Sequence, residues 1–555
     1  MYTLTFKIEG EKDKKCQVEA GEKVLNAALA QGIEIDAPCA GNGTCGKCRV
    51  RLISGALEMP DNPRLSQADR EDMWYLACQS KVIGDAVVWI PRSASAFKQD
   101  IATADLSTPA ELERYNKAIE AIFASGIKPG CECGGYGIAI DIGTTTVTGA
   151  LLDMASGNVL GKASRGNGQI KYGADVINRI IQQSKPGGVE RLQKAVKEET
   201  IIPIITALLK ESGKKAEDVS RVVIAGNTTM EHLFMGADGQ TIRLEPYVPQ
   251  FLELEGLKAA QEGIPAAKDA DLILAPNVGS YVGGDITAGV LDTLMWNAPE
   301  MSLFIDLGTN GELVLGNSDY MLCCACSAGP AFEGGDISCG MRATTGAIDS
   351  IHLDDESLKP EYTLIAGDKP AGLCGSGLIS IIGELFRTGA ISAKGKFIRQ
   401  SDRIRYDEYG GNYIVASAEE SVTGKAIELT EGDIDNFIRA KGAIFSAIRT
   451  MLKSLDMTVD DIDKIIIAGG IGSGIDIGKA IEIGMLPKAD LNKYSYIGNS
   501  SLTGACAMLL SEEATEKVFD IGRNMTYIEL STEPGYMDEF LAACFLPHTD
   551  SSLFD

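Results

Sequence analysis

The sequence predicts an α/β multidomain protein in which a small β-rich domain precedes a larger domain of mixed strands and helices. The chain has 555 residues, and single hydrophobic cores seldom grow beyond ~300 residues. Short runs near the N-terminus alternate apolar and polar residues, as half-buried strands do. Further along, the pattern of apolar strand, Asp-x-Gly-Thr turn and second strand occurs twice, which suggests a duplicated architecture facing one ligand.

Composition narrows the possible partners. Apolar residues form 45% of the chain, enough for a large core, and the net charge is −26. An acidic surface repels phosphate, so nucleic acid is not expected as a partner. No apolar run reaches the ~18 residues of a membrane span. The N-terminal "MYTLTFKIEG" lacks a basic stretch before an apolar block, so we expect a cytoplasmic protein with reduced thiols.

The first elements read as a hairpin followed by a helix. Residues 2–9 alternate in the manner of a strand, and residues 16–20 can return as its partner. Residues 22–32 have helical spacing and end at a glycine suited to a helix C-terminus. Two further strand-like runs follow, at 48–55 and 85–91.

A glycine-rich loop, "CAGNGTCGKC", carries the first chemical signal. Cys39, Cys45 and Cys48 are spaced C-x5-C-x2-C, and Cys78 follows in "YLACQS". Four thiolates can hold an iron–sulfur cluster, and glycines let backbone N–H groups approach the sulfurs. A structural zinc site usually presents two C-x2-C knuckles, and only one is present here. Buried reduced thiols are the other alternative, but three in one glycine-rich loop favour the cluster.

Other cysteines give weaker signals. Cys131 and Cys133 form a C-x-C pair, which alone does not indicate a metal. Cys323, Cys324 and Cys326 stand in an apolar run, where cysteine behaves as a small buried residue. A second cluster there lacks a fourth ligand at matching spacing.

We expect three segments: residues 1–94, a linker at 95–133 and a large domain at 134–555. The linker begins in a Ser/Ala/Thr-rich stretch and contains one helical pattern at 109–126. It can be a passive spacer or a tether that lets the first domain swing. The sequence leaves both open.

Two similar turns in the large domain are candidates for binding phosphate. Backbone N–H groups and hydroxyls in such turns cradle phosphate, while an aspartate holds Mg2+ through water. No GK[ST] sequence is present, so neither is a Walker loop. The first turn supplies Asp141, Gly143, Thr144, Thr145 and Thr146. The second supplies Asp306, Gly308, Thr309 and Asn310.

A third glycine-rich turn, at 463–481, follows a buried strand and leads into a helix. Its Gly469, Gly470 and Gly472 leave room for a base or ribose against bare backbone. Elsewhere, Asn227 is expected to cap a helix, and His232 to be a core residue. Glycine stretches at 277–290 and 372–380 are expected to be inter-lobe hinges or helix starts.

These patterns resemble two known folds. Residues 1–92 look like a β-grasp ferredoxin with one [2Fe–2S] cluster, whose x5 spacing matches the adrenodoxin-like branch. The three turns resemble the two phosphate motifs and the adenosine motif of the actin, Hsp70 and sugar-kinase superfamily. This implies a two-lobed actin-like ATPase with mixed sheets. By that resemblance Asp141 and Asp306 face each other across ATP–Mg2+, and Gly334 and Gly335 of "GPAFEGGD" lie near phosphate.

An electron carrier fused to an ATPase suggests an uphill reduction. A gap of ~240 mV for one electron is about 5.5 kcal/mol, and a conformational switch from 1:99 to 99:1 needs about the same. The combination resembles the ATP-dependent reductive activators of corrinoid proteins, which reduce Co(II) to Co(I). That resemblance implies an ATP-hydrolysing oxidoreductase in which the four cysteines carry the electron and Asp306 positions the attacking water.

It also implies partners: a corrinoid protein as acceptor, a low-potential donor such as ferredoxin or flavodoxin, and, by analogy, a homodimer. The alternatives are an activator of a radical-forming dehydratase, a sugar-type kinase with a fused ferredoxin, and a nucleotide-sensing scaffold without turnover. The dehydratase activators resemble a shorter chain with a [4Fe–4S] cluster shared between subunits.

Overall fold

The structure is a computed structural model that describes most of the chain. The described residues are 1–8, 12–33, 35, 37, 41, 43, 46–65, 67–91, 108–131, 134–470 and 474–554. The chain divides into two compact units, Met1–Ala102 with Gly168–Gln182, and Thr103–Asn167 with Gln183–Asp555. Among the described residues, no helix combines the length and the apolar character that a membrane span requires.

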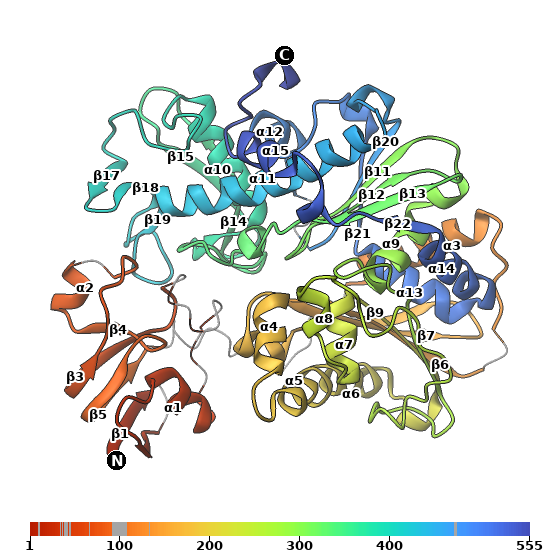
Figure 1. Ribbon diagram of the computed structural model, residues 1–555, viewed down its shortest axis with the longest axis horizontal. Helices are drawn as coiled ribbons and strands as arrows, with labels where there is room; N and C mark the ends of the chain where they lie inside the picture. The colour runs from red at the N-terminus through yellow and green to blue at the C-terminus, as the bar shows by residue number, and fades with distance from the viewer. Residues whose placement is uncertain are drawn as a thin grey trace. The chain divides into compact units, whose positions relative to one another are not determined.

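The first unit is built on a five-stranded sheet in the order β2-β1-β5-β3-β4, coloured red to orange in Figure 1. β1 pairs antiparallel with β2 and parallel with β5, so the predicted hairpin is confirmed. Its elements are β1 Tyr2–Ile8, β2 Lys14–Val18, α1 Val24–Ala30, β3 Arg49–Glu58, α2 Gln67–Glu71, β4 Trp74–Leu76 and β5 Lys81–Ile90.

Helix α1 covers this sheet through an apolar stripe. Val24, Leu25 and Ala28 are buried in one core with Leu4 and Phe6 of β1. The helix ends where predicted, because Gly32 has φ of +62°, a left-handed conformation that glycine adopts without strain. The alternation of the sequence therefore gives a sheet with one face against the helix.

The larger unit contains two sheets of matching topology. One has the order β10-β9-β6-β7-β8 and the other β21-β20-β11-β12-β13-β22. In each, three consecutive strands form an antiparallel meander, and the next strands add parallel to the first. We call the part built on the β6 sheet the first lobe and the part built on the β11 sheet the second lobe. The predicted duplication and mixed sheets are confirmed.

The strands of these sheets are short, and the central ones, such as β7, β9 and β12, are almost wholly buried. The first lobe has β6 Tyr136–Ile142, β7 Thr146–Asp153, β8 Val159–Gly166, β9 Val219–Gly226 and β10 Asp271–Leu274. The second lobe has β11 Ser302–Asp306, β12 Glu312–Gly316, β13 Met321–Ala325, β20 Lys464–Ala468, β21 Tyr494–Gly498 and β22 Met525–Tyr527. Two three-stranded sheets accompany them: β14 Ala347–Leu353, β15 Pro360–Leu364 and β16 Gly372–Leu373, and β17 Ile404–Asp407, β18 Gly410–Ala416 and β19 Ile427–Thr430.

The helices of the larger unit are α3 Pro109–Ala124, α5 Gly188–Val196, α6 Ile202–Ser212, α7 Thr228–Met235, α8 Gln240–Arg243, α9 Gly284–Thr293, α10 Gly375–Arg387, α11 Glu431–Ser454, α12 Ile477–Glu482, α13 Ser500–Leu510, α14 Glu512–Asn524 and α15 Tyr536–Ala543. Helix α4 Val176–Gln183 begins within the segment grouped with the first unit.

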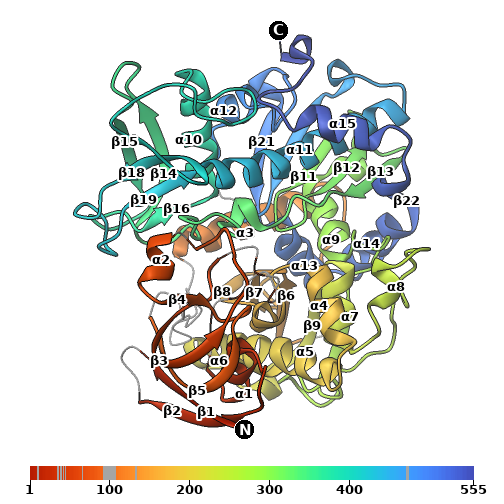
Figure 2. The ribbon, with the colours of Figure 1, turned by 60° about the vertical axis from the view of Figure 1, so that its left-hand side comes forward.

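Helices α9 and α13 pack directly against each other between the two lobes (Figures 1 and 2). Glycines permit the close approach: a Cβ on Gly504 would lie 1.9 Å from the carbonyl oxygen of Ala288, and one on Gly289 would lie 2.9 Å from Ser500 Oγ. Because the two backbones nearly touch, larger side chains cannot be accommodated without separating the helices. This crossing joins corresponding parts of the duplicated halves.

The helix predicted at 109–126 is observed as α3. Thr108 accepts from the backbone N–H of Glu111, and the Glu111 carboxylate accepts from the backbone N–H of Thr108, a reciprocal cap that explains its start. Ile119 and Ile122 are buried in the core that also contains α9 and α13. The helix is therefore packed into the larger unit, while residues 92–107 lie outside the described residues.

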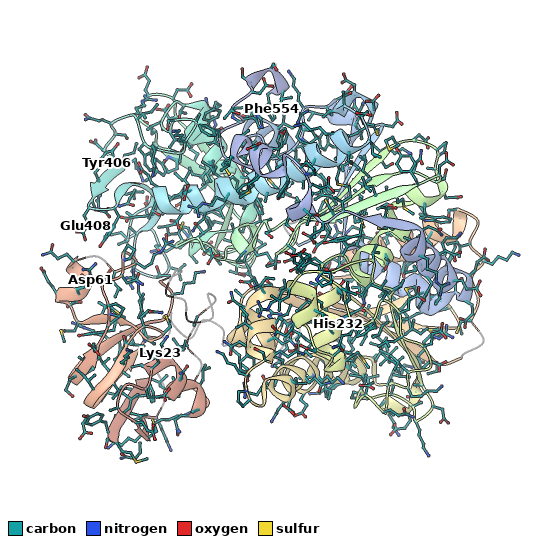
Figure 3. The ribbon with its side chains drawn as sticks, viewed as in Figure 1. Lys23, Asp61, His232, Tyr406, Glu408 and Phe554 are labelled. Atoms are coloured by element: carbon teal, nitrogen blue, oxygen red, sulfur yellow. The ribbon has the colours of Figure 1, made fainter. Side chains whose placement is uncertain are left out.

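Two helices, a histidine and three cysteines of the larger unit lie as the sequence predicts. α9 and α10 begin in the two glycine stretches, so these are helix starts. His232, labelled in Figure 3, is buried: its Nδ1 lies 2.7 Å from Thr228 O, and its Nε2 accepts from Gln250 N–H. Burial lowers the pKa of His232 to about 4, as expected of a core histidine. The predicted apolar setting of three cysteines is confirmed, since Cys323, Cys324 and Cys326 are buried.

Candidate functional site

The thiol loop of the first unit is described in part. Cys39 and Cys45 lie outside the described residues. Cys48 and Cys78 are 1% and 0% exposed, and the N–H of Ala77, next to Cys78, donates to Cys48 O at 2.8 Å. Pairing of β3 with β4 carries the chain from one cysteine to the neighbourhood of the other. Two of the four predicted ligands are thus brought near each other in a buried setting.

The glycines of this loop adopt conformations that other residues avoid. Gly41, Gly43 and Gly46 have φ of +90°, +78° and +70°. A Cβ on Gly43 would lie 2.9 Å from the Gln79 side chain, and Gln79 Nε2 donates to Gly41 O at 2.6 Å. Gly41 and Gly43 therefore lie close against Gln79, next to Cys78, as the glycine-rich composition predicts.

The first phosphate-type turn joins β6 to β7 in the larger unit. Asp141 precedes it, and its carboxylate accepts from Asn499 Nδ2 at 2.8 Å and from Ser501 Oγ at 2.9 Å. Both partners stand at the start of α13, where Asn499 also caps the helix by accepting from Leu502 N–H. Helix α13 therefore fixes the Asp141 carboxylate at the end of its strand.

The turn itself is held by two asparagines. Asn167 donates from Nδ2 to Gly143 O at 3.0 Å and from its backbone N–H to Thr145 O at 2.9 Å. Asn227, the predicted cap of α7, donates from Nδ2 to Thr144 Oγ1 at 3.1 Å. A Cβ on Gly143 would meet Thr146 O at 2.5 Å, so the turn requires glycine there.

The second turn, between β11 and β12, meets the first across the lobes. Thr145 Oγ1 and Thr309 Oγ1 are 3.0 Å apart. Both hydroxyls donate to the same carboxylate oxygen, Glu333 Oε2, with a separation of 2.6 Å for Thr309. Asp306 ends β11, just as Asp141 lies near the end of β6. The two turns of the duplicated pattern thus meet at one place, which fits the prediction that both face one ligand.

Gly308 and Gly470 differ from the other predicted glycines because a Cβ on either would meet no atom of the described residues within 4 Å. Gly469 instead has φ of +106°, and a Cβ there would lie 2.4 Å from Leu307 O. Gly472 lies outside the described residues. Open space beside Gly308 and Gly470 is what a bound phosphate or ribose would need, whereas Gly469 is required by packing.

Gly334 and Gly335 are likewise positions where close packing leaves no room for a side chain. A Cβ on Gly334 would lie 2.4 Å from Met341 N, and one on Gly335 would lie 2.5 Å from Pro330 Cβ. They shape the segment that carries Glu333, which ends the 3-10 helix η6 (Pro330–Glu333).

Several carboxylates lie around the two turns. Burial and their mutual repulsion raise the pKa values of most of them. Burial, with the charges of Asp141 and Glu333, raises the pKa of Asp306 to about 7. The pKa values of Asp285 and Glu312 are raised well above their usual range by burial and by neighbouring carboxylates. Burial raises the pKa of Asp141 as well, against its hydrogen bonds to α13. Such a group favours a bound cation, which would stabilise the ionised forms.

Sequence reasoning missed Asp285, Glu312, Glu333, Asn499 and Ser501. Glu312 follows the second turn directly in "DLGTNGE", and Glu333 stands within "GPAFEGGD", so their positions were a usable signal. Asp285 follows the paired glycines that start α9. Asn499 and Ser501 offered no signal, because only the packing of α13 brings them to Asp141.

Family models match three consecutive parts of the chain. Residues 6–82 match the model described as a 2Fe-2S iron-sulfur cluster binding domain. Residues 136–298 match the RACo middle region, and residues 300–555 match the C-terminal domain of RACo, the ASKHA domain. ASKHA denotes the superfamily of acetate and sugar kinases, Hsp70 and actin.

Similar proteins align over most of the chain. A corrinoid activation enzyme, RamQ, of Eubacterium limosum is 36% identical over 416 residues, which are 73% of this chain and 69% of that enzyme. A Co(II) methylated amine-specific corrinoid protein reductase of Methanosarcina barkeri is 26% identical over 70% of this chain and 73% of its own length. A solved structure of a reductive activator for corrinoid, iron–sulfur protein covers 100% of both chains with 38% identity and a TM-score of 0.71.

The fold and these matches define an iron–sulfur enzyme in which a [2Fe–2S] ferredoxin-type domain is fused to an ASKHA ATPase domain. The chain belongs to the RACo family. The resemblance drawn from the cysteine spacing and the three glycine turns is confirmed.

Proposed function

We propose that this protein activates a corrinoid protein by ATP-dependent reduction, passing one electron from its [2Fe–2S] cluster to convert Co(II) to Co(I). The observation that carries the proposal is the presence of both RACo regions and a ferredoxin domain in one chain. The names of the similar proteins, a corrinoid activation enzyme and a corrinoid protein reductase, support the same acceptor. Reduction to Co(I) would allow methyl transfer to resume.

We propose Cys39, Cys45, Cys48 and Cys78 as the cluster ligands. The chemistry of the donor set fits, because four thiolates are the usual ligands of a [2Fe–2S] cluster, and the cluster supplies a one-electron carrier. The burial of Cys48 and Cys78 keeps water from the sulfurs. Glycines in left-handed conformations, such as Gly41, Gly43 and Gly46, would let backbone N–H groups approach the sulfurs of a cluster.

We propose Asp141 and Asp306 as the residues that organise Mg–ATP, with Asp306 positioning the attacking water. Both carboxylates are half-buried with raised pKa values, and a bound cation would stabilise their ionised forms, which supports a cation there. The remaining residues proposed around the nucleotide keep their predicted roles. Phosphate is assigned to Gly143, Thr144, Thr145, Thr146, Gly308, Thr309 and Asn310, with Gly334 and Gly335 shaping a neighbouring segment, and adenosine to Gly469, Gly470 and Gly472.

The larger unit is suited to couple nucleotide binding to a change of shape. Its lobes are joined by the α9–α13 crossing and by hydrogen bonds between their two turns. A ligand that binds both turns favours one arrangement of the lobes over others, and only such differential binding can shift a conformational equilibrium. Hydrolysis would then reset the enzyme after each electron transfer.

The acceptor can be tested with protein reconstituted with iron and sulfide and reduced anaerobically. A purified Co(II) corrinoid protein is added with ATP, with a non-hydrolysable ATP analogue, or without nucleotide, and Co(I) is followed by its absorption spectrum. We expect Co(I) to form over repeated turnovers with ATP, at most one Co(I) for each protein with the analogue, and none without nucleotide. Equal Co(I) formation in all three reactions, or none in any, contradicts the proposal.

The electron donor, the oligomeric state and the cellular location are further proposals. We propose a low-potential donor of the ferredoxin or flavodoxin class, since an acceptor harder to reduce than the cluster needs a strong reductant upstream. A homodimer and a cytoplasmic location stay predictions, which analytical ultracentrifugation and cell fractionation can test.

A further inference from the structure

Glu333 occupies a particular position between the two turns. Its Oε2 accepts hydrogen bonds from Thr145 Oγ1 and from Thr309 Oγ1, and the two hydroxyls are 3.0 Å apart. A carboxylate and a phosphate are both anionic acceptors for hydroxyl donors. The two hydroxyls that would face phosphate are thus engaged by a side chain of the protein's own second lobe.

We propose that Glu333 is a nucleotide-displaced latch, a positioning residue whose carboxylate competes with the terminal phosphates of ATP for the hydroxyls of Thr145 and Thr309. This inference rests on the proposed assignment of the two turns to phosphate. Each hydroxyl has one proton to donate, and a carboxylate beside phosphate adds like-charge repulsion. ATP therefore binds fully only when Glu333 leaves.

Displacement of Glu333 would move the segment that follows it, residues 334–342. Arg342, near its end, donates from Nη2 to Thr145 O at 3.2 Å, so the segment is tied to the first-lobe turn at a second point. The segment contains left-handed residues, with φ of +77° at Gly334 and +55° at Asp336. A non-glycine residue in that region is held by its surroundings at some energetic cost, and Asn436 Nδ2 of α11 donates to Asp336 O at 2.7 Å.

Helix α11 receives this segment through its first turns. The backbone N–H of Ser338 donates to Asp433 Oδ1 at 2.8 Å, and its hydroxyl donates to the other carboxylate oxygen. Phe332, next to Glu333, packs edge-to-face on Phe437 of α11 with ring centroids 5.4 Å apart. Contacts on both sides of Glu333 therefore lead to the N-terminal end of the 24-residue α11. Displacement of Glu333 would therefore alter the contacts that hold the N-terminal end of α11.

The latch is tested by E333Q, which keeps the shape and the acceptor oxygen but removes the charge. Neutral hydrogen bonds are roughly half as strong as charge-assisted ones, so we expect E333Q to bind ATP about tenfold more tightly, equivalent to about 1.4 kcal/mol. AMP lacks the terminal phosphates, so its affinity should stay unchanged. The matched control is E356Q, which removes an exposed carboxylate of the same lobe and should leave both affinities unchanged.

Fluorescence titration with nucleotide analogues gives these affinities without any need for the corrinoid protein. Unchanged or weaker ATP binding by E333Q, or equal tightening for AMP, overturns the latch. If the wild-type protein binds no ATP, the proposed function fails with it. If the wild type binds ATP and E333Q does not tighten, the latch alone fails.

A second measurement stands even if E333Q folds poorly. Hydrogen–deuterium exchange of the wild-type protein is compared with and without ATP. We expect amide exchange in residues 333–342 and in the first two turns of α11 to change by severalfold on ATP addition and not on AMP addition. Exchange that responds equally to both nucleotides, or to neither, contradicts displacement.

Discussion

Asp306 gives the sharpest test of the carboxylate group at the turns, through the variant Asp306→Asn. Burial and the neighbouring charges of Asp141 and Glu333 raise the pKa of Asp306 from 3.8 to about 7. One pKa unit corresponds to about 1.4 kcal/mol, so an ionised Asp306 destabilises the fold by at most about 4 kcal/mol. Asp306 keeps part of its surface open to solvent, which makes this an upper bound.

Proton linkage determines whether the stability of the fold rises or falls with pH. A carboxyl group whose pKa is raised in the folded state binds its proton more tightly when folded, so stability falls as pH rises from 3.8 to about 7. Replacing Asp306 by asparagine removes that loss. The variant should therefore be stabilised relative to the wild type by up to about 4 kcal/mol at pH 8 and by up to about 1.6 kcal/mol at pH 5.

Calorimetry of thermal unfolding at pH 5 and pH 8, without nucleotide, measures the difference in stability between Asp306→Asn and the wild type in the larger unit. Asp319→Asn, at the exposed turn between β12 and β13, is the control and should give no pH-dependent difference. With saturating Mg–ATP the order should reverse, because only the wild type gains stability from the ligand. An equal effect of Asp306→Asn at both pH values, or destabilisation at pH 8, would refute the electrostatic reasoning.

Four further outcomes are expected. Cys78→Ala should lose the visible absorption of the reconstituted cluster, read against wild type at equal iron and sulfide; retained absorption would remove Cys78 from the ligand set. Gly470→Ala should leave thermal stability unchanged but weaken ATP binding by about tenfold, since its Cβ enters open space. Gly334→Ala should instead lower the free energy of unfolding by about 1–3 kcal/mol, because its left-handed backbone lies against Met341; a stability equal to wild type would contradict this. Gly504→Leu should lower it by about 3 kcal/mol or more, as the α9–α13 crossing has no room for a side chain, and circular dichroism on heating checks it.

Much of the fold could be predicted because local patterns and global architecture agree. The alternation of residues 2–9 and the two strand–turn–strand repeats are short-range signals, and strands β1, β6, β7, β11 and β12 lie where they indicate. The end of α1 was also local, since Gly32 adopts the left-handed conformation that closes a helix. Such elements need no knowledge of distant partners.

The contacts that complete the site could not be predicted, because they join residues far apart in the chain. Asn499 and Ser501 reach Asp141 only through the packing of α13, some 358 and 360 residues away. Glu333 stood in a quoted glycine motif, but its two threonine partners come from different lobes. The sequence predicts the helix at 109–126 as part of a linker, because its burial depends on α9 and α13, which lie far along the chain.

The measurement that tests the central claim most directly is a count of electrons during one turnover. Pre-reduced protein is mixed anaerobically with a Co(II) corrinoid protein in a stopped-flow spectrometer, and re-oxidation of the cluster is recorded together with Co(I) absorption. The account predicts that both signals rise together, one cluster for each Co(I), and only when ATP is present. Co(I) that forms while the cluster stays reduced, or at the same rate without ATP, would contradict it.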